Sequence, residues 1–157
     1  MSIKSLGKIA AVAAVAGLAL TACADEATSQ ARAQEETCGV FLGANNKANE
    51  AVSRAMQTGD SGNARAATVV ESAALDIRNH AFDRSDDVKA PGSNDSIALR
   101  TVLQVQAQFF DDMATTIGDD GVSALNTMTP EDVEVNGMSH SEATQALTGY
   151  CGSYFGS

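Results

Sequence analysis

After residue 37, apolar residues recur at intervals of three and four along most of the chain, which is the spacing of amphipathic helices. The first stripe runs through residues 38–56 and is followed by the turn-forming sequence 59–63. The second stripe runs through residues 64–88 and stops at the Pro91-Gly92 pair. The pattern therefore predicts two helices in succession, joined by a short turn.

A third stripe, through residues 99–117, is the most regular in the sequence. Ser93 or Asn94 would cap the helix that it predicts, and Gly118 would end it. Residues 122–128 then suggest one short helical piece, and the Asn136-Gly137 pair breaks the chain again.

The last predicted helix begins at a capping box, in which Ser139 is followed three residues later by Glu142. Apolar residues and both tyrosines, Tyr150 and Tyr154, then fall on one face. Long alternating strand patterns are missing from the sequence, so we expect an all-α fold. The simplest architecture is a small up-down bundle of about four main helices.

The N-terminus has a different character from these helices. Lys4 and Lys8 precede an unbroken run of 14 apolar or small residues, 9–22. Such a run is too short to cross a bilayer as a helix, which takes about 20 residues. It is typical of the apolar core of a secretory signal peptide.

The run ends in Leu20-Thr21-Ala22-Cys23, which resembles the lipobox of bacterial lipoproteins. The resemblance implies that residues 1–22 are removed and that Cys23 carries a diacylglyceryl group. Buried acyl chains, at about 0.8 kcal/mol per methylene, would hold the protein on the extracytoplasmic side of a bacterial membrane. The alternative is an ordinary cleaved signal peptide.

The sequence therefore divides into a signal peptide (1–22), an acylated cysteine with a flexible tether (23–36) and a helical bundle domain (37–157). The tether is polar and carries no sustained apolar stripe. Its residues are also good helix formers, so it could belong to the first helix.

The net charge of −10 excludes one class of partner. Loss of Lys4 and Lys8 with the leader would leave eight basic residues against 20 acidic ones, a net charge of −12. A chain this acidic does not bind nucleic acid through counterion release. Anionic lipid headgroups would also repel it, so the lipid on Cys23 must do the anchoring.

Two cysteines remain after the lipobox, Cys38 and Cys151. Outside the cytoplasm such a pair usually forms a disulfide. Both fall on predicted inward-facing stripes, so we expect them to pair and to tie the first helix to the last. Closing a loop of this size would contribute about 4–5 kcal/mol.

Residues that could carry chemistry are few. His80 lies beside the apolar stripe of the second helix and, with Tyr150 or Tyr154, could form a ligand site for haem. The simpler interpretation is that His80 is a hydrogen-bonded residue at the edge of the core. We identify no metal site.

Signatures of hydrolases and phosphate-binding loops are missing from the sequence. We therefore expect a non-enzymatic lipoprotein without a cofactor, with a binding or structural role at the cell envelope. Its partners would be membrane lipid, through Cys23, and another envelope protein. The alternative is a carrier of a small molecule, haem or a lipid, in the bundle interior.

Overall fold

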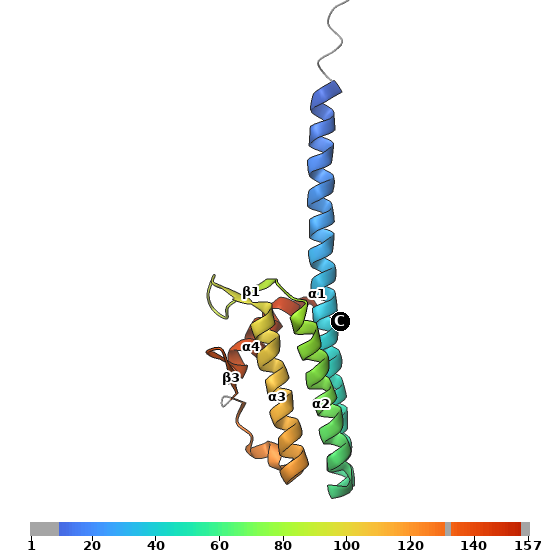
Figure 1. Ribbon diagram of the computed structural model, residues 1–157, viewed down its shortest axis with the longest axis vertical. Coiled ribbons are helices and arrows are strands. Elements are labelled where there is room, and N and C mark those ends of the chain that lie inside the picture. The colour runs from blue at the N-terminus through green and yellow to red at the C-terminus, as the bar shows by residue number, and fades with distance from the viewer. Residues whose placement is uncertain (1–9, 131–132, 155–157) are drawn as a thin grey trace, which may run out of the picture. The chain divides into compact units, whose positions relative to one another are not determined.

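The computed structural model describes residues 10–130 and 133–154, with side chains from residue 26 onward apart from residue 153 (Figure 1). The chain divides into an N-terminal unit, residues 1–35, and a helical unit, residues 36–157. Helix α1 (Ala10–Thr58) supplies residues to both. In the N-terminal unit the chain is helical from Ala10, including the segment predicted as a tether, and the side chains of residues 26–32 are exposed. The role of that segment as a tether stays a prediction.

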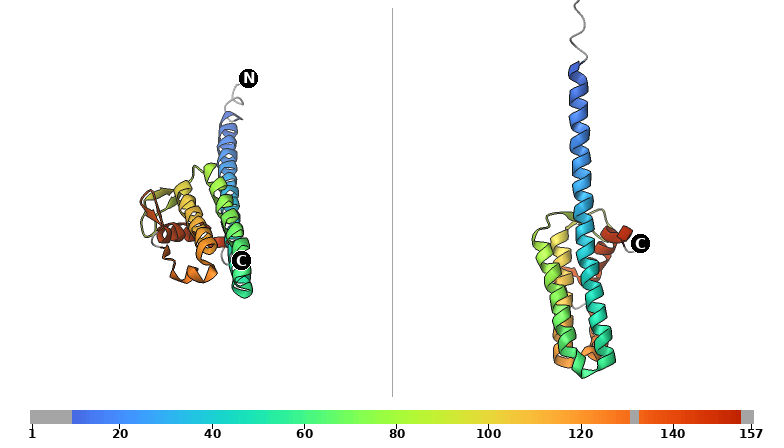
Figure 2. Two further views of the ribbon diagram at one scale, coloured as in Figure 1. Left: turned by 60° about the horizontal axis from the view of Figure 1, so that its bottom comes forward. Right: turned by 90° about the vertical axis from the view of Figure 1, so that its right-hand side faces the viewer.

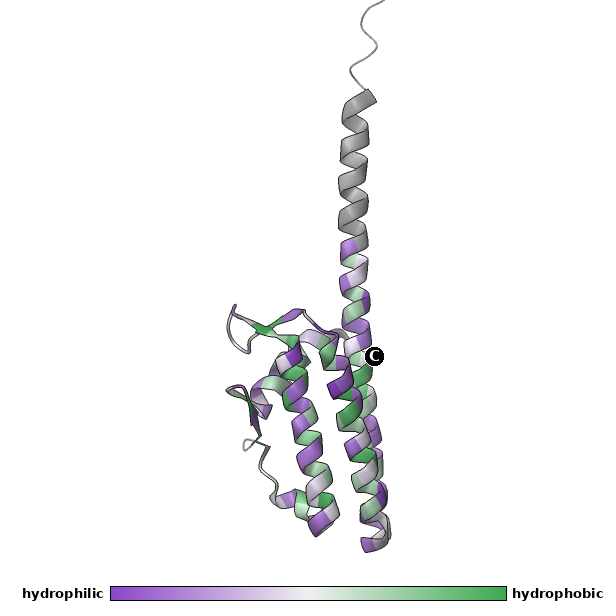
Figure 3. Ribbon diagram, viewed as in Figure 1, coloured by the Kyte–Doolittle hydropathy of each residue, from purple (hydrophilic) through white to green (hydrophobic). Residues whose placement is uncertain are grey.

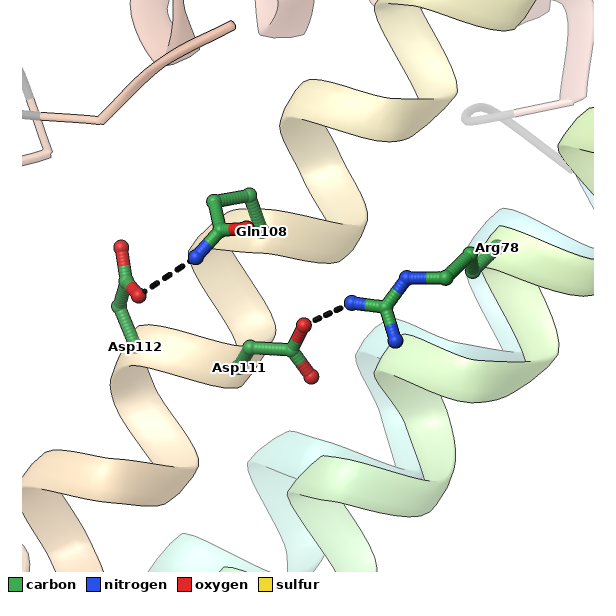
Figure 4. Close-up of polar contacts among 4 residues, drawn as sticks. All are labelled: Arg78, Gln108, Asp111 and Asp112. Carbon is green, nitrogen blue, oxygen red and sulfur yellow. Dashed lines mark hydrogen bonds and ion pairs between the residues drawn. The ribbon is translucent and has the colours of Figure 1, made fainter.

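The helical unit contains the end of α1 and the helices α2 (Asp60–Phe82), α3 (Leu99–Asp120) and α4 (His140–Cys151). The end of α1, α2 and α3 lie side by side in both views of Figure 2, and α4 contacts α3. A polar contact also joins two of these helices, because Arg78 of α2 forms an ion pair with Asp111 of α3 (Figure 4). The predicted mainly helical fold is therefore confirmed.

The turn between α1 and α2 is shorter than the sequence predicted. Only Gly59 separates the two helices, and it adopts a φ of 64°, a left-handed conformation that glycine enters without strain. Gly62, in the first turn of α2, lies close to α1, since a Cβ there would come within 2.9 Å of Ala55 Cα. Glycine at this position therefore lets the two helices approach closely.

Two short hairpins correct the strictly all-α prediction. Strands β1 (Asp87–Lys89) and β2 (Ser96–Ala98) pair antiparallel, with Val88 opposite Ile97. The second helix consequently ends at Phe82 instead of residue 88. Val88 still reaches the core, at 4% exposure, but it does so from a strand.

The start of the third helix shifts for the same reason. Since residues 96–98 pair with β1, α3 begins at Leu99 with Ala98 as its N-cap residue. The predicted cap Ser93 instead bonds within the turn, where its hydroxyl accepts from the Asp95 backbone N–H at 3.0 Å. The helix ends at Asp120, one turn beyond the predicted stop, and Gly121 follows at a φ of 84°.

In the C-terminal part, the short helical piece is confirmed as the 3₁₀ helix η1 (Val122–Thr127). The second hairpin pairs β3 (Glu134–Val135) with β4 (Met138–Ser139). Its turn is Asn136-Gly137, both at positive φ, which is the favoured chemistry of a tight hairpin.

The predicted capping box forms at the start of α4. The Ser139 hydroxyl accepts from the Glu142 N–H at 3.3 Å, and the Glu142 carboxylate accepts from the Ser139 N–H at 2.9 Å. The short 3₁₀ helix η3 (Gly152–Tyr154) follows α4.

The core combines a few large aliphatic side chains with many alanines. The helices of the helical unit carry hydrophobic and hydrophilic residues in alternation along the ribbon, as amphipathic helices do (Figure 3). The largest fully buried aliphatic residues are Ile77, Leu99, Leu103, Ile117 and Leu147. The buried residues of α1 and α2 are mostly small and include Ala44, Ala48, Ala55, Ala66, Val70 and Ala73. Small side chains let these two helices pack closely but leave shallow grooves between their outer faces.

Candidate functional site

The predicted disulfide is present and joins α1 to α4. The Cα atoms of Cys38 and Cys151 lie 5.6 Å apart, and both residues are fully buried. The two cysteines are separated by 113 positions in the sequence, so the bond closes most of the helical unit into one loop. The pair is therefore a structural cross-link in the core.

His80, in the last turn of α2, lies at the edge of this core, beside the segment of α1 that contains Cys38. Its Nε2 atom lies 2.9 Å from the hydroxyl of Thr37, the residue before Cys38. Burial lowers the pKa of His80, and the nearby Arg84 guanidinium lowers it further, while Glu36 and Asp83 oppose the shift. The imidazole is therefore mainly neutral at pH 7.

Tyr150 and Tyr154 are half-buried near the C-terminus and pack against the core. Burial raises the pKa of Tyr150, the Asp86 carboxylate raises it further, and Arg84 opposes the shift. The same arginine thus acts electrostatically on His80 and on Tyr150. The groove that His80 lines includes neither Tyr150 nor Tyr154, so a joint ligand site of the three residues stays a prediction.

Arg84 is an unusual side chain in this neighbourhood. It is only 13% exposed, and its Nη2 atom donates to the Glu36 carboxylate at 2.9 Å. Among the described residues, its buried Nε has no hydrogen-bond partner. The sequence did hold a signal, because Arg84 falls on the apolar stripe of the second helix, where an arginine is out of place.

Two grooves follow the outer face of α1 and α2. The first, the His80 groove, measures about 440 Å³ and is lined by residues that include Gly39, Gly43 and His80. The second, the arginine groove, also measures about 440 Å³, lies nearer the Gly59 turn and includes Arg54 and Arg65.

Lys47 lines both grooves, and its ammonium group lies 2.9 Å from the Asp76 carboxylate. This ion pair joins α1 to α2 at the point where the two grooves meet. A further depression of about 480 Å³, lined by Pro91, Ile97 and Met138 among others, lies between the two hairpins.

The other histidine, His140, is the first residue of α4. His140 is half-buried and stacks on Phe109 with ring centroids 3.8 Å apart. Its neighbour Thr144 accepts a hydrogen bond of 2.9 Å from the buried amide of Gln106. These contacts hold α4 against α3, so His140 has a structural explanation.

Among the described residues, no group of three or more His, Cys, Asp or Glu side chains could hold a metal ion. The side chain of Cys23, the predicted lipid attachment site, lies outside the side chains that the structure describes. The arrangement as a whole offers grooves and charged side chains for binding. Comparison with known protein families, with curated proteins and with solved structures finds no match to this chain.

Proposed function

We propose that this protein is a bacterial envelope lipoprotein, anchored by an acylated Cys23, whose helical unit binds another envelope component without catalysing a reaction. The observation that carries the proposal is the buried disulfide between Cys38 and Cys151. Structural disulfides persist in oxidising compartments such as the periplasm and the cell surface. That placement agrees with the export that the lipobox implies.

The anchor in this proposal is lipid, not a membrane-spanning helix. Within the described part of the chain, no helix combines the length and apolarity needed to cross a bilayer. The unit that the lipid would hold is proposed to be an up-down bundle. The one-residue connection at Gly59 supports this topology, since so short a link joins antiparallel neighbours.

The anchor is tested by growing expressing cells with an alkyne-bearing palmitate and detecting the label on the purified protein. We expect labelling of the wild type in the membrane fraction and its loss in Cys23→Ala. Ser29→Ala serves as the matched control, because it changes an exposed residue outside the lipobox and the disulfide and should keep the label. An unlabelled wild type in the growth medium, or a label that survives Cys23→Ala, would refute the anchor.

A second candidate function is the transport of a small molecule such as haem or a lipid. The half-buried His80 favours it, because this imidazole lines a groove of about 440 Å³ and imidazole is a common metal ligand. Addition of haem to the purified protein should then produce a Soret band that weakens in His80→Ala. An unchanged spectrum, together with the absence of bound lipid in native mass spectrometry, would remove this candidate.

A further inference from the structure

The lining of the arginine groove is positively charged, whereas the protein as a whole is negatively charged. The protein carries a net charge of −10, yet Lys47, Arg54 and Arg65 line this groove with a single acidic residue, Glu50. These four residues sum to +2, and the Asp76 carboxylate that pairs with Lys47 reduces the local charge to +1. Because most of the surface repels anions, an anionic ligand would concentrate at this groove.

The two arginines are placed to hold one anionic group together. Arg54 lies five residues before the Gly59 turn on α1, and Arg65 lies six residues after it on α2. They therefore line the groove at the same level from opposite sides. Arginine donates to carboxylate and phosphate oxygens through two parallel N–H groups, which suits such a clamp.

Both arginines can turn toward a ligand. Among the described residues Arg65 has no ion-pair partner, and Arg54 pairs only with Glu50, four residues earlier on the same helix. That pair is exposed, with side chains 73% and 63% accessible, and exposed pairs contribute little stability. A ligand therefore displaces a weak contact.

The floor of the groove is apolar and of limited length. It includes the buried Ala55 and Ala66 and the half-buried Ala51 and Val69. At the far end the lining stops at Lys47, seven residues before Arg54 on α1, where Lys47 pairs with Asp76. At about 1.5 Å per residue, the apolar floor runs for about 10 Å.

We infer that the arginine groove binds an amphiphile with one anionic head, a carboxylate or a phosphate, and a medium-length apolar chain. The anionic head group of the ligand lies between Arg54 and Arg65, and its apolar chain lies on the apolar floor of the groove toward Lys47. The volume of about 440 Å³ is in the range of small-molecule sites. This inference deepens the proposed binding role and rests on it.

The test uses the mature exported protein, reconstituted in nanodiscs of phosphatidylcholine, and a decanoate analogue that carries a photoreactive diazirine. After irradiation, the modified peptides are mapped by mass spectrometry, with empty nanodiscs as the blank. We expect labelling within residues 47–69 that unlabelled decanoate or decyl phosphate displaces, the stronger competitor identifying the head group. Labelling elsewhere, or displacement by acetate or inorganic phosphate at the same concentrations, would overturn the inference.

Variants sharpen the test because their expected effects differ in sign. Arg54→Gln and Arg65→Gln should each weaken labelling about fivefold, as about 1 kcal/mol at an exposed site implies. Glu50→Gln should strengthen it, since it removes the opposing carboxylate and frees Arg54. Lys89→Gln, an exposed lysine of β1 outside the groove, should have no effect. Equal loss in all four variants would contradict the arginine clamp.

The site proposed for the apolar chain of the ligand is tested separately by Ala51→Leu, which adds bulk to the half-buried floor of the groove. Labelling should fall while the circular dichroism melting curve keeps its midpoint. Unchanged labelling would refute the apolar floor as the chain site. If the exported product is recovered without an acyl group, the proposed anchor is refuted. The same photolabelling experiment on that product still tests whether the arginine groove binds the amphiphile.

Discussion

Removal of the disulfide is the most direct perturbation of this fold. Cys38→Ala and Cys151→Ala, made together, open a loop spanning 113 positions and remove two fully buried sulfur atoms, which leaves two methyl side chains. In the chain-entropy treatment, a loop of this size lowers the entropy of the unfolded chain enough to contribute about 5 kcal/mol at 25 °C. Domains of this size have a total stability of about 5–15 kcal/mol.

The assay is urea denaturation of the wild type and the double variant, followed by circular dichroism at the helical band. We expect the double variant to lose about 5 kcal/mol of unfolding free energy, or to be unfolded without urea. Its slope against urea should rise, because an unfolded chain without the cross-link exposes more surface. Cys23→Ala is the matched control and should leave the midpoint unchanged.

Two results would refute this reasoning. One is a loss below about 1 kcal/mol, which would mean that closing the loop adds little to the stability. The other is labelling of both Cys38 and Cys151 by a thiol reagent in the denatured, unreduced wild-type protein, which would mean that the bond does not form.

Three further predictions concern single positions. Gly62→Ala should destabilise the fold by about 1–3 kcal/mol in urea denaturation, because the added Cβ would press on Ala55. Gly39→Ala, whose Cβ would meet nothing within 4 Å, should stabilise the fold by about 0.5–1 kcal/mol. Equal effects of the two variants would contradict the close approach of α1 and α2 at Gly62. Ser139→Ala should cost about 1 kcal/mol in the same assay, and no change would mean that the cap at α4 is dispensable. The lowered pKa of His80 means that the unfolded state takes up a proton first, so stability should be greatest above the unfolded pKa and should fall as the pH drops through the folded pKa. Comparing urea midpoints at pH 7 and pH 5 checks this, since His80→Gln should show a smaller decrease than the wild type, and an equal decrease would assign the effect to other groups.

The helices were predictable because their signals are local. The stripe through residues 99–117 and the Ser139–Glu142 capping box depend on residues within a few turns of one another, and both were confirmed. The disulfide was also predictable, since only two cysteines follow the lipobox and both fall on inward-facing stripes. The lipid on Cys23 stays a prediction.

The hairpins were missed because strand pairing depends on distant partners. Val88 fits a helical stripe as well as a strand, and only its pairing with Ile97 decides between them. The mislocated start of α3 has the same origin. The sequence places Arg84 beside His80 on the second helix, but it does not predict the Glu36 partner of Arg84, because that contact joins residues 48 positions apart.

By itself, the sequence determined the mainly helical fold and the cysteine pair, because periodicity, capping and the small number of cysteines need no knowledge of distant contacts. Only the tertiary structure decided where the grooves lie and which charges line them. Arg54 and Arg65 become neighbours across a groove because Gly59 reverses the chain in one residue and Gly62 lets α1 and α2 approach. Such proximity depends on the separation and rotation of two packed helices, which packing sets and local pattern does not encode.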